Sequence, residues 1–246
     1  MTLDIVATGS GGNCYLLAAG RDTLMLDCGV SYKRIQNALG YDASRVTGCL
    51  VTHEHNDHTR ALGDLARAGI DCYMTRGTAD AKGVSGHRIH PVTAGRAFTA
   101  GRFTAYPFQT EHDAAEPVGF LLSYEPTGER LLYATDTFFL RYAFKGVHYF
   151  MVECNYCKGI ASTRYLNGEL AKPLYDRLLA SHFSLDHLKD FFRACDLTAA
   201  RQIILVHLSD GNSDERRMVR EIQSVTGVAT AAAAAGQRHE LTLTPF

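Results

Sequence analysis

The chain has 246 residues, of which 46% are hydrophobic and 21% charged, enough for one sizeable core in a single α/β domain. The formal net charge is −1 and Lys and Arg are scattered, which argues against tight binding to duplex DNA or anionic lipid. No stretch approaches the roughly 20 apolar residues of a membrane span, and no signal peptide is evident. We therefore expect one cytoplasmic domain over residues 1–246, with no membrane partner.

Seven cysteines are present, an odd number, and most of them lie in apolar segments. This pattern favours buried free thiols in a reducing compartment over a disulfide framework. Cys154 and Cys157 form a single Cys-x-x-Cys pair. Without a second pair, ordinary packing is favoured over a redox or zinc role.

The first half of the chain alternates short apolar runs with glycine-rich or polar turns. The glycine-rich loop 8–13 lacks the lysine ending of a phosphate-binding loop, and its glycines allow another backbone to approach closely. The patterns predict strands at 3–7, 14–18, 23–26, 46–51 and 70–75, and helices at 31–39, 59–68 and 78–82.

The second half continues with a clear hairpin and then helices. Segment 158–170 is polar, and we expect a mobile loop there. The next helix is expected to be capped by Ser184 or Asp186, and the last helix by Ser213. The patterns predict strands at 102–109, 118–124, 130–134, 148–152, 201–206, near 228 and at 239–243, and helices at 173–180, up to about 194 and up to 225. This order predicts two sheets packed face to face with helices outside.

The segment from His53 to His58 holds three histidines and two carboxylates. It connects a predicted strand to a predicted helix, where α/β proteins often place chemistry. On an extended segment His53 and His55 point the same way, so both imidazoles can bind one ion. Asp57 and His58 turn away at the start of the helix and can hold a second ion. Burying these groups together without an ion would be costly.

Other polar residues stand where predicted strands end. Asp27 follows an apolar run, and we expect it either to orient a metal-ligating histidine or to act as the acid at the next helix N-terminus. Asp136 follows a buried strand of the hairpin. His112 and His207 are lone histidines at strand ends, and each is weak support for a metal site when taken alone.

The spacing His-x-His-x-Asp-His from His53, with Asp27, His112, Asp136 and His207 in that order, resembles the signature of the metallo-β-lactamase superfamily. Finer motifs are similar to its YycJ/WalJ-like branch, which is grouped with phosphodiesterases and nucleases. These motifs are Gly9–Asn13, His112–Ala114 with Pro117–Phe120, Glu153–Asn155, Ser181–Ser184 and His207–Asn212. The resemblance implies an α/β fold, a four-layer αββα sandwich of two mixed sheets.

The same resemblance implies a site for two divalent metal ions. Histidine content favours zinc, while the oxygen ligands leave manganese open. Asp57 would also orient the attacking water, His182 would bind the phosphate or protonate the leaving group, and Asn155 would contact a substrate oxygen. Alternatively, His182 is a surface histidine at a helix boundary and Asn155 is structural. The implied ligands are His53, His55 and His112 for one ion, Asp57, His58 and His207 for the other, and Asp136 between them.

The resemblance implies a metal-dependent phosphodiester hydrolase, in particular a nuclease acting as a 5′ exonuclease on single-stranded DNA-like substrates. Tyr156 and Tyr165 could stack on bases. The near-neutral charge leaves open a phosphodiesterase of small cyclic nucleotides or cyclic phosphates, and a glyoxalase II-like thioesterase is a weaker alternative. A non-catalytic module with structural zinc is disfavoured because such sites are usually rich in cysteine. A homodimer is left open.

Overall fold

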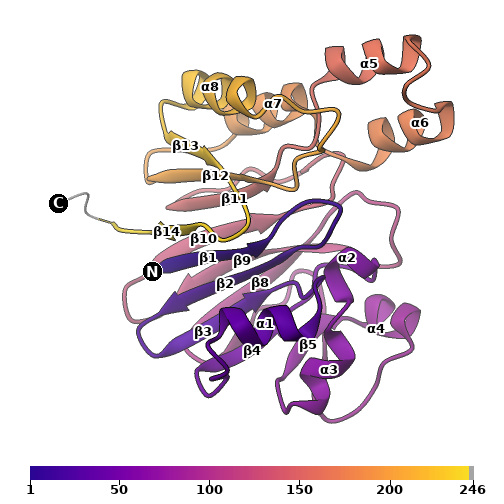
Figure 1. Ribbon diagram of the computed structural model, residues 1–246. Helices are drawn as coiled ribbons and strands as arrows, with labels where there is room; N and C mark the ends of the chain where they lie inside the picture. Colours follow the sequence, from indigo (N-terminus) through magenta and orange to yellow (C-terminus); the bar gives the residue numbers. More distant parts are fainter. Residues whose placement is uncertain (244–246) are drawn as a thin grey trace. The chain divides into compact units, whose positions relative to one another are not determined.

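The computed structural model describes residues 1–243. Within these residues the strands form two mixed sheets of seven strands each. The chain divides into two compact units, one made of residues 1–109, 114–129 and 234 onward, the other of residues 110–113 and 130–233. The strand orders are β14-β1-β2-β3-β4-β5-β6 and β13-β12-β11-β10-β9-β8-β7 (Figure 1).

In the first unit, β1 to β3 are antiparallel and β3 to β6 are parallel. The carboxyl ends of β3, β4 and β5 therefore lie at one edge of the sheet. The strands are β1 (Thr2–Ala7), β2 (Cys14–Ala19), β3 (Asp22–Leu26), β4 (Val46–Leu50), β5 (Cys72–Thr75), β6 (Ile89–Val92), β7 (Phe98–Ala100), β8 (Phe103–Gln109), β9 (Val118–Tyr124) and β14 (Arg238–Glu240). The helices are α1 (Tyr32–Ala38), α2 (Asn56–Thr59), α3 (Leu62–Arg67) and α4 (Arg76–Lys82).

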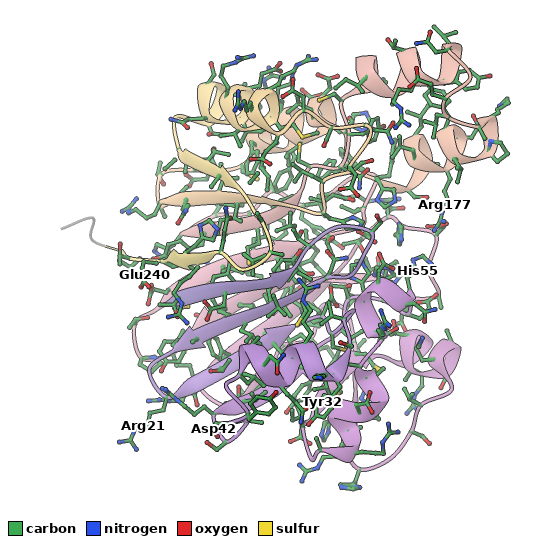
Figure 2. All side chains as sticks on the ribbon, in the orientation of Figure 1. Arg21, Tyr32, Asp42, His55, Arg177 and Glu240 are labelled. Atoms are coloured by element: carbon green, nitrogen blue, oxygen red, sulfur yellow. The ribbon has the colours of Figure 1, made fainter. Side chains whose placement is uncertain are left out.

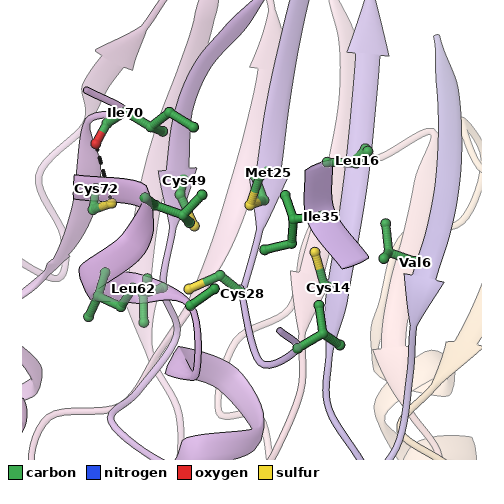
Figure 3. Packing of buried hydrophobic residues seen from close by; sticks show 14 of the residues in the cluster. Val6, Cys14, Leu16, Met25, Cys28, Ile35, Cys49, Leu62, Ile70 and Cys72 are labelled. Carbon is green, nitrogen blue, oxygen red and sulfur yellow. Dashed lines mark hydrogen bonds between the residues drawn. The ribbon is translucent and has the colours of Figure 1, made fainter. Parts of the chain in front are cut away.

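Helices α1, α3 and α4 contribute apolar side chains to the core on one face of this sheet (Figure 3). Ile35 of α1 and Leu65 of α3 are fully buried there. Cysteines from neighbouring strands lie in the same core, and Cys49 of β4 is the register partner of Cys72 of β5. All seven cysteines are free, as the sequence predicted. Burial raises the pKa of the Cys14 thiol, so it behaves as a small apolar side chain.

In the second unit, β10 to β13 are parallel neighbours. Aromatic side chains pack the strands against the helices, as where Phe150 of β11 meets Phe192 of α7 edge to face. The strands are β10 (Glu129–Ala134), β11 (Tyr149–Glu153), β12 (Gln202–Val206) and β13 (Ala229–Ala232). The helices are α5 (Lys158–Leu166), α6 (Lys172–Ser181), α7 (Leu185–Ala194) and α8 (Glu215–Thr226).

The predicted fold class, α/β with two mixed sheets and helices, is confirmed. Within residues 1–243 no helix is long and apolar enough to cross a membrane. The prediction of one domain over residues 1–246 stays a prediction.

Several local predictions were wrong. Residues 158–166 form α5 rather than a loop, because Ala161 is buried and the Tyr165 ring stacks on Tyr175 of α6, 4.6 Å between centroids. The helix expected at 59–68 is interrupted: Thr59 ends the short helix α2, and a separate helix α3 covers Leu62–Arg67. Strands β6 and β7 were not predicted. The cap of α8 is Asp214, whose carboxylate accepts from the backbone N–H of Arg217, rather than Ser213.

Candidate metal centre

The first cluster of site residues lies after the neighbouring parallel strands β3 and β4. Asp27 follows β3, and its Oδ1 accepts a hydrogen bond from the backbone N–H of Thr52 at 2.8 Å. Its Oδ2 lies 2.8 Å from Nδ1 of His58, and both side chains are fully buried. The first turn of α1 contains no acidic residue, so Asp27 does not act as its N-terminal acid. Its contacts are those of a carboxylate that orients a histidine.

His53 and His55 bring their rings together at the start of α2. Nε2 of His53 lies 3.0 Å from Nδ1 of His55. The Thr52 hydroxyl donates to Asp27 and lies 3.0 Å from Nδ1 of His53. This hydroxyl therefore accepts from Nδ1–H of His53, which leaves a lone pair on Nε2. Figure 2 shows His55 at the beginning of α2.

Gly29 and the glycine-rich loop 8–13 fix this cluster through the backbone. A Cβ on Gly29 would lie 1.6 Å from the carbonyl oxygen of Asp57, so only glycine fits there. The same carbonyl accepts from the backbone N–H of Asn13 at 2.7 Å. The Asn13 amide group also donates to Nε2 of His58 at 3.1 Å. The close backbone approach expected of the loop glycines is made by Gly12, where a Cβ would lie 2.4 Å from the carbonyl oxygen of Gly29.

The second cluster lies in the other unit, where β10, β11 and β12 end side by side. Asp136 comes two residues after β10, Glu153 ends β11 and His207 follows β12. Since parallel strands end at the same edge, these side chains converge. Together with His182, which follows α6, each offers a ligand atom within 4.8 Å of the others. This second cluster is completed by His112, whose Nε2 lies 3.8 Å from Asp136.

Glu153 is the buried centre of the second cluster, a role that the sequence motifs did not predict. Its Oε1 lies 2.7 Å from Nδ1 of His182 and 2.9 Å from Nδ1 of His207. Its Oε2 accepts from the backbone N–H groups of Thr137 and Phe183. Burial opposes ionisation, but the charge and hydrogen bond of His182 outweigh it and lower the pKa of Glu153. The sequence does contain a signal for Glu153, because it is a carboxylate at the end of an apolar strand. The same signal predicted the role of Asp27.

Two further histidines have defined orientations. Nδ1 of His112 lies 3.0 Å from the carbonyl oxygen of Ser181, which can only accept, so Nδ1 carries the proton. Burial lowers the pKa of His112, which favours the neutral imidazole. Burial also acts to lower the pKa of His182, but the Glu153 carboxylate raises it overall. The bond to Glu153 shows that His182 is not a loosely held surface histidine.

Three of the site residues adopt left-handed backbone conformations. The φ angles of Asp27, Asp136 and His207 are 56°, 47° and 54°. Such conformations cost non-glycine residues on the order of 1–3 kcal/mol and tend to occur at functional sites. Each of these residues comes directly or nearly directly after a strand, where the turn aims its side chain into its cluster.

Asn155 and the two tyrosines have well-defined places. The Asn155 amide group donates to the carbonyl oxygen of His207 at 2.9 Å, so it holds the end of β12 in place. Tyr156 is only 1% exposed, and burial raises its pKa to about 12. The expectation that Tyr156 stacks on a base was therefore wrong. One face of the Tyr165 ring stacks on Tyr175.

The donor set of both clusters fits divalent metal ions. The histidines for which an Nδ1 acceptor is defined carry their lone pair on Nε2, the atom that a metal ion would take from its present hydrogen-bond partner, and carboxylates accompany them. Buried carboxylates behind the imidazoles fix the tautomers, as is usual at metal sites.

The chain belongs to the metallo-β-lactamase superfamily, because the sequence profile of that superfamily matches residues 7–143. The chain is therefore a metal-dependent hydrolase. It is 28% identical over 244 residues to the exodeoxyribonuclease WalJ of Streptococcus pneumoniae, covering 91% of this chain and 86% of that protein. It is 30% identical over 155 residues to the exodeoxyribonuclease YycJ of Bacillus anthracis, covering 58% and 57%. These similarities confirm the resemblance to the YycJ/WalJ-like branch.

The crystal structure of the metallo-β-lactamase fold protein YhfI from Bacillus subtilis has the same fold. The TM-score is 0.75 at 15% sequence identity, covering 97% of this chain and 98% of that one. The chain therefore has the metallo-β-lactamase fold that the sequence motifs implied.

Proposed function

We propose that the chain is a phosphodiester hydrolase with a site for two metal ions, and that it acts as a nuclease. His53, His55 and His112 would hold one ion, Asp57, His58 and His207 would hold the other, and Asp136 would be a ligand of both. The histidines favour zinc, and the carboxylates leave manganese open. When bound, the ions ionise water near neutral pH and neutralise charge on phosphate oxygens.

One observation carries this proposal: His58 and His207 each have Nδ1 beside a buried carboxylate, Asp27 or Glu153. Nδ1 of His207 also lies 2.6 Å from Asp136. In both cases the proton belongs on Nδ1, and Nε2 is the ligand atom. Carboxylates behind histidines have this arrangement at metal sites, where they raise ligand basicity and fix the ring.

The chain's own residues would then divide the chemical work. Asp57, 3.5 Å from His58, orients the attacking water toward phosphorus. His182 is held by Glu153 through Nδ1, so its Nε2 can bind a phosphate oxygen or protonate the leaving alkoxide. Asn155 reaches a substrate oxygen only if its bond to His207 is exchanged, and we propose this contact as a secondary one.

The substrate we propose is the end of a single DNA strand, cut as a 5′ exonuclease. Support comes from the two relatives named as exodeoxyribonucleases, of which WalJ is similar over nearly the whole chain. A net charge of −1 without a polybasic run suits a short strand end better than long duplex DNA. The near-zero net charge also favours a second candidate substrate, a small cyclic nucleotide or cyclic phosphate.

Cleavage assays separate these candidates. Zinc- or manganese-loaded protein is incubated with single-stranded DNA labelled at the 5′ or the 3′ end, and in parallel with cyclic nucleotides. A 5′ exonuclease releases labelled mononucleotide at once from the 5′ label and progressively shortens the 3′-labelled strand. Turnover of cyclic nucleotides without DNA cleavage would reject the nuclease and support the small-substrate phosphodiesterase.

A further inference from the structure

The loop that follows Asp136 carries two exposed aromatic side chains. Phe139 is 43% exposed and Tyr142 is 39% exposed. Tyr142 lies beside Phe144, with ring centroids 6.1 Å apart. Within residues 1–243, Phe139 makes no ring contact. Single exposed apolar residues are common, so exposure alone means little; the setting of Phe139 is what matters.

The loop of residues 137–139 is hydrogen-bonded to the segment that carries His112. The backbone N–H of Phe138 donates to the carbonyl oxygen of Glu111 at 2.8 Å. The backbone N–H of Glu111 in turn donates to the Thr137 hydroxyl at 3.0 Å, and this hydroxyl donates to the carbonyl oxygen of Phe139 at 2.8 Å. The aromatic ring is therefore presented by a backbone that is already ordered, which lowers the entropic cost of binding a ligand.

Phe139 is also close to the second cluster along the chain. It lies three residues after Asp136, so their Cα atoms are at most about 11 Å apart. Arg141, two residues further, is 72% exposed and forms an ion pair with Glu111 at 2.7 Å. A strand whose phosphate reaches Asp136 can thus bring a neighbouring base to Phe139.

We propose that Phe139 is a stacking platform for a nucleobase of a single-stranded nucleic acid, next to the phosphate that is cut. This inference rests on the proposed nuclease function and names what the site recognises. Stacking works with any base and is made by an uncharged side chain, so it is open to a chain of net charge −1. Phe139 also takes over the stacking role expected of Tyr156, whose side chain is buried.

The test measures kcat/KM for a short single-stranded DNA in Phe139→Ala, Phe139→Trp and a matched control. Tyr106→Ala is that control, because Tyr106 lies on β8 and is 42% exposed. We expect Phe139→Ala to lower kcat/KM by about 5- to 150-fold. Phe139→Trp keeps most of the activity because it restores an aromatic face, and Tyr106→Ala has no effect.

Strands with a single abasic position supply the second measurement. In the wild type, removing the base that stacks on Phe139 lowers kcat/KM by as much as Phe139→Ala does. In Phe139→Ala, the same abasic strand is cut as well as the intact strand, which also shows that this variant is folded. The stacking role of Phe139 would be contradicted if the abasic position lowered kcat/KM equally in both proteins, or if Phe139→Ala had the kcat/KM of the wild type. Neither result would contradict the nuclease proposal. A wild type that cuts no DNA would overturn the nuclease proposal as well.

Discussion

The imidazole of His58 meets the carboxylate of Asp27 at 2.8 Å, and neither side chain is exposed to solvent. In the second cluster Glu153 holds Nδ1 of His182 and of His207 in the same way. Each cluster thus contains a buried carboxylate whose contacts are with histidines and backbone or hydroxyl donors. Such carboxylates set the direction in which Nε2 points.

Asp27→Asn tests this orienting role. The substitution keeps the shape and tolerates the left-handed backbone, but the amide cannot match the charge behind His58. We expect the affinity for zinc to fall about 10- to 100-fold, as for other groups that orient ligands. Competition with a chromophoric chelator measures it, with Asp42→Asn as the exposed control. Unchanged zinc affinity would show that Asp27 serves packing only.

His182→Asn tests proton transfer to the leaving group. A nitrophenolate departs without a proton, whereas a DNA alkoxide needs one. General-acid catalysis contributes typically 10²–10⁴-fold, so we expect a loss of about that size for DNA and a much smaller loss for bis(p-nitrophenyl) phosphate. Equal losses on both substrates would assign His182 to phosphate binding instead.

Metal removal is expected to abolish turnover. The clusters gather imidazoles and carboxylates whose repulsion and desolvation an ion relieves, so the apoprotein should also have a lower Tm. Dialysis against a chelator, followed by titration with zinc or manganese, measures activity and Tm together. Activity that survives complete chelation would contradict a metal-dependent reaction.

The cysteines predict a simple pattern of thiol reactivity. Burial raises the pKa of Cys14 and Cys154, so they hold little thiolate at pH values near neutrality. Cys195 is partly exposed, although burial raises its pKa too. Ellman's reagent should therefore modify Cys195 first and all seven thiols only after unfolding. Rapid modification of several thiols in the native protein would contradict the buried cysteine core.

Much of the candidate site could be predicted because its residues stand at strand ends. Asp27 and Asp136 were recognisable as carboxylates that follow apolar runs, and the histidine motif has a specific spacing. Glu153 shows the same signal, but its contacts come from His182 and His207, 29 and 54 residues away. Partners that distant along the chain are not visible in local patterns.

The split between α2 and α3 also depends on distant contacts. In a continuous helix the backbone N–H of Ala61 would bond to the carbonyl oxygen of Asp57. That carbonyl instead accepts from Asn13, and Ala61 donates to the carbonyl oxygen of Cys28. Local periodicity predicts one helix there, and tertiary hydrogen bonds divide it. The formation of helix α5 likewise depends on a contact with another element, because the Tyr165 ring of α5 stacks on Tyr175 of α6.

Turnover of bis(p-nitrophenyl) phosphate by protein loaded with zinc or manganese tests the central claim most directly. Asp57→Ala is measured beside it, with the surface variant Asp64→Ala as control. The proposal predicts hydrolysis by the wild type and by Asp64→Ala, and its loss in an Asp57→Ala protein that remains folded. No hydrolysis with zinc, manganese or cobalt, although two ions are bound, would contradict phosphodiester hydrolysis at this site.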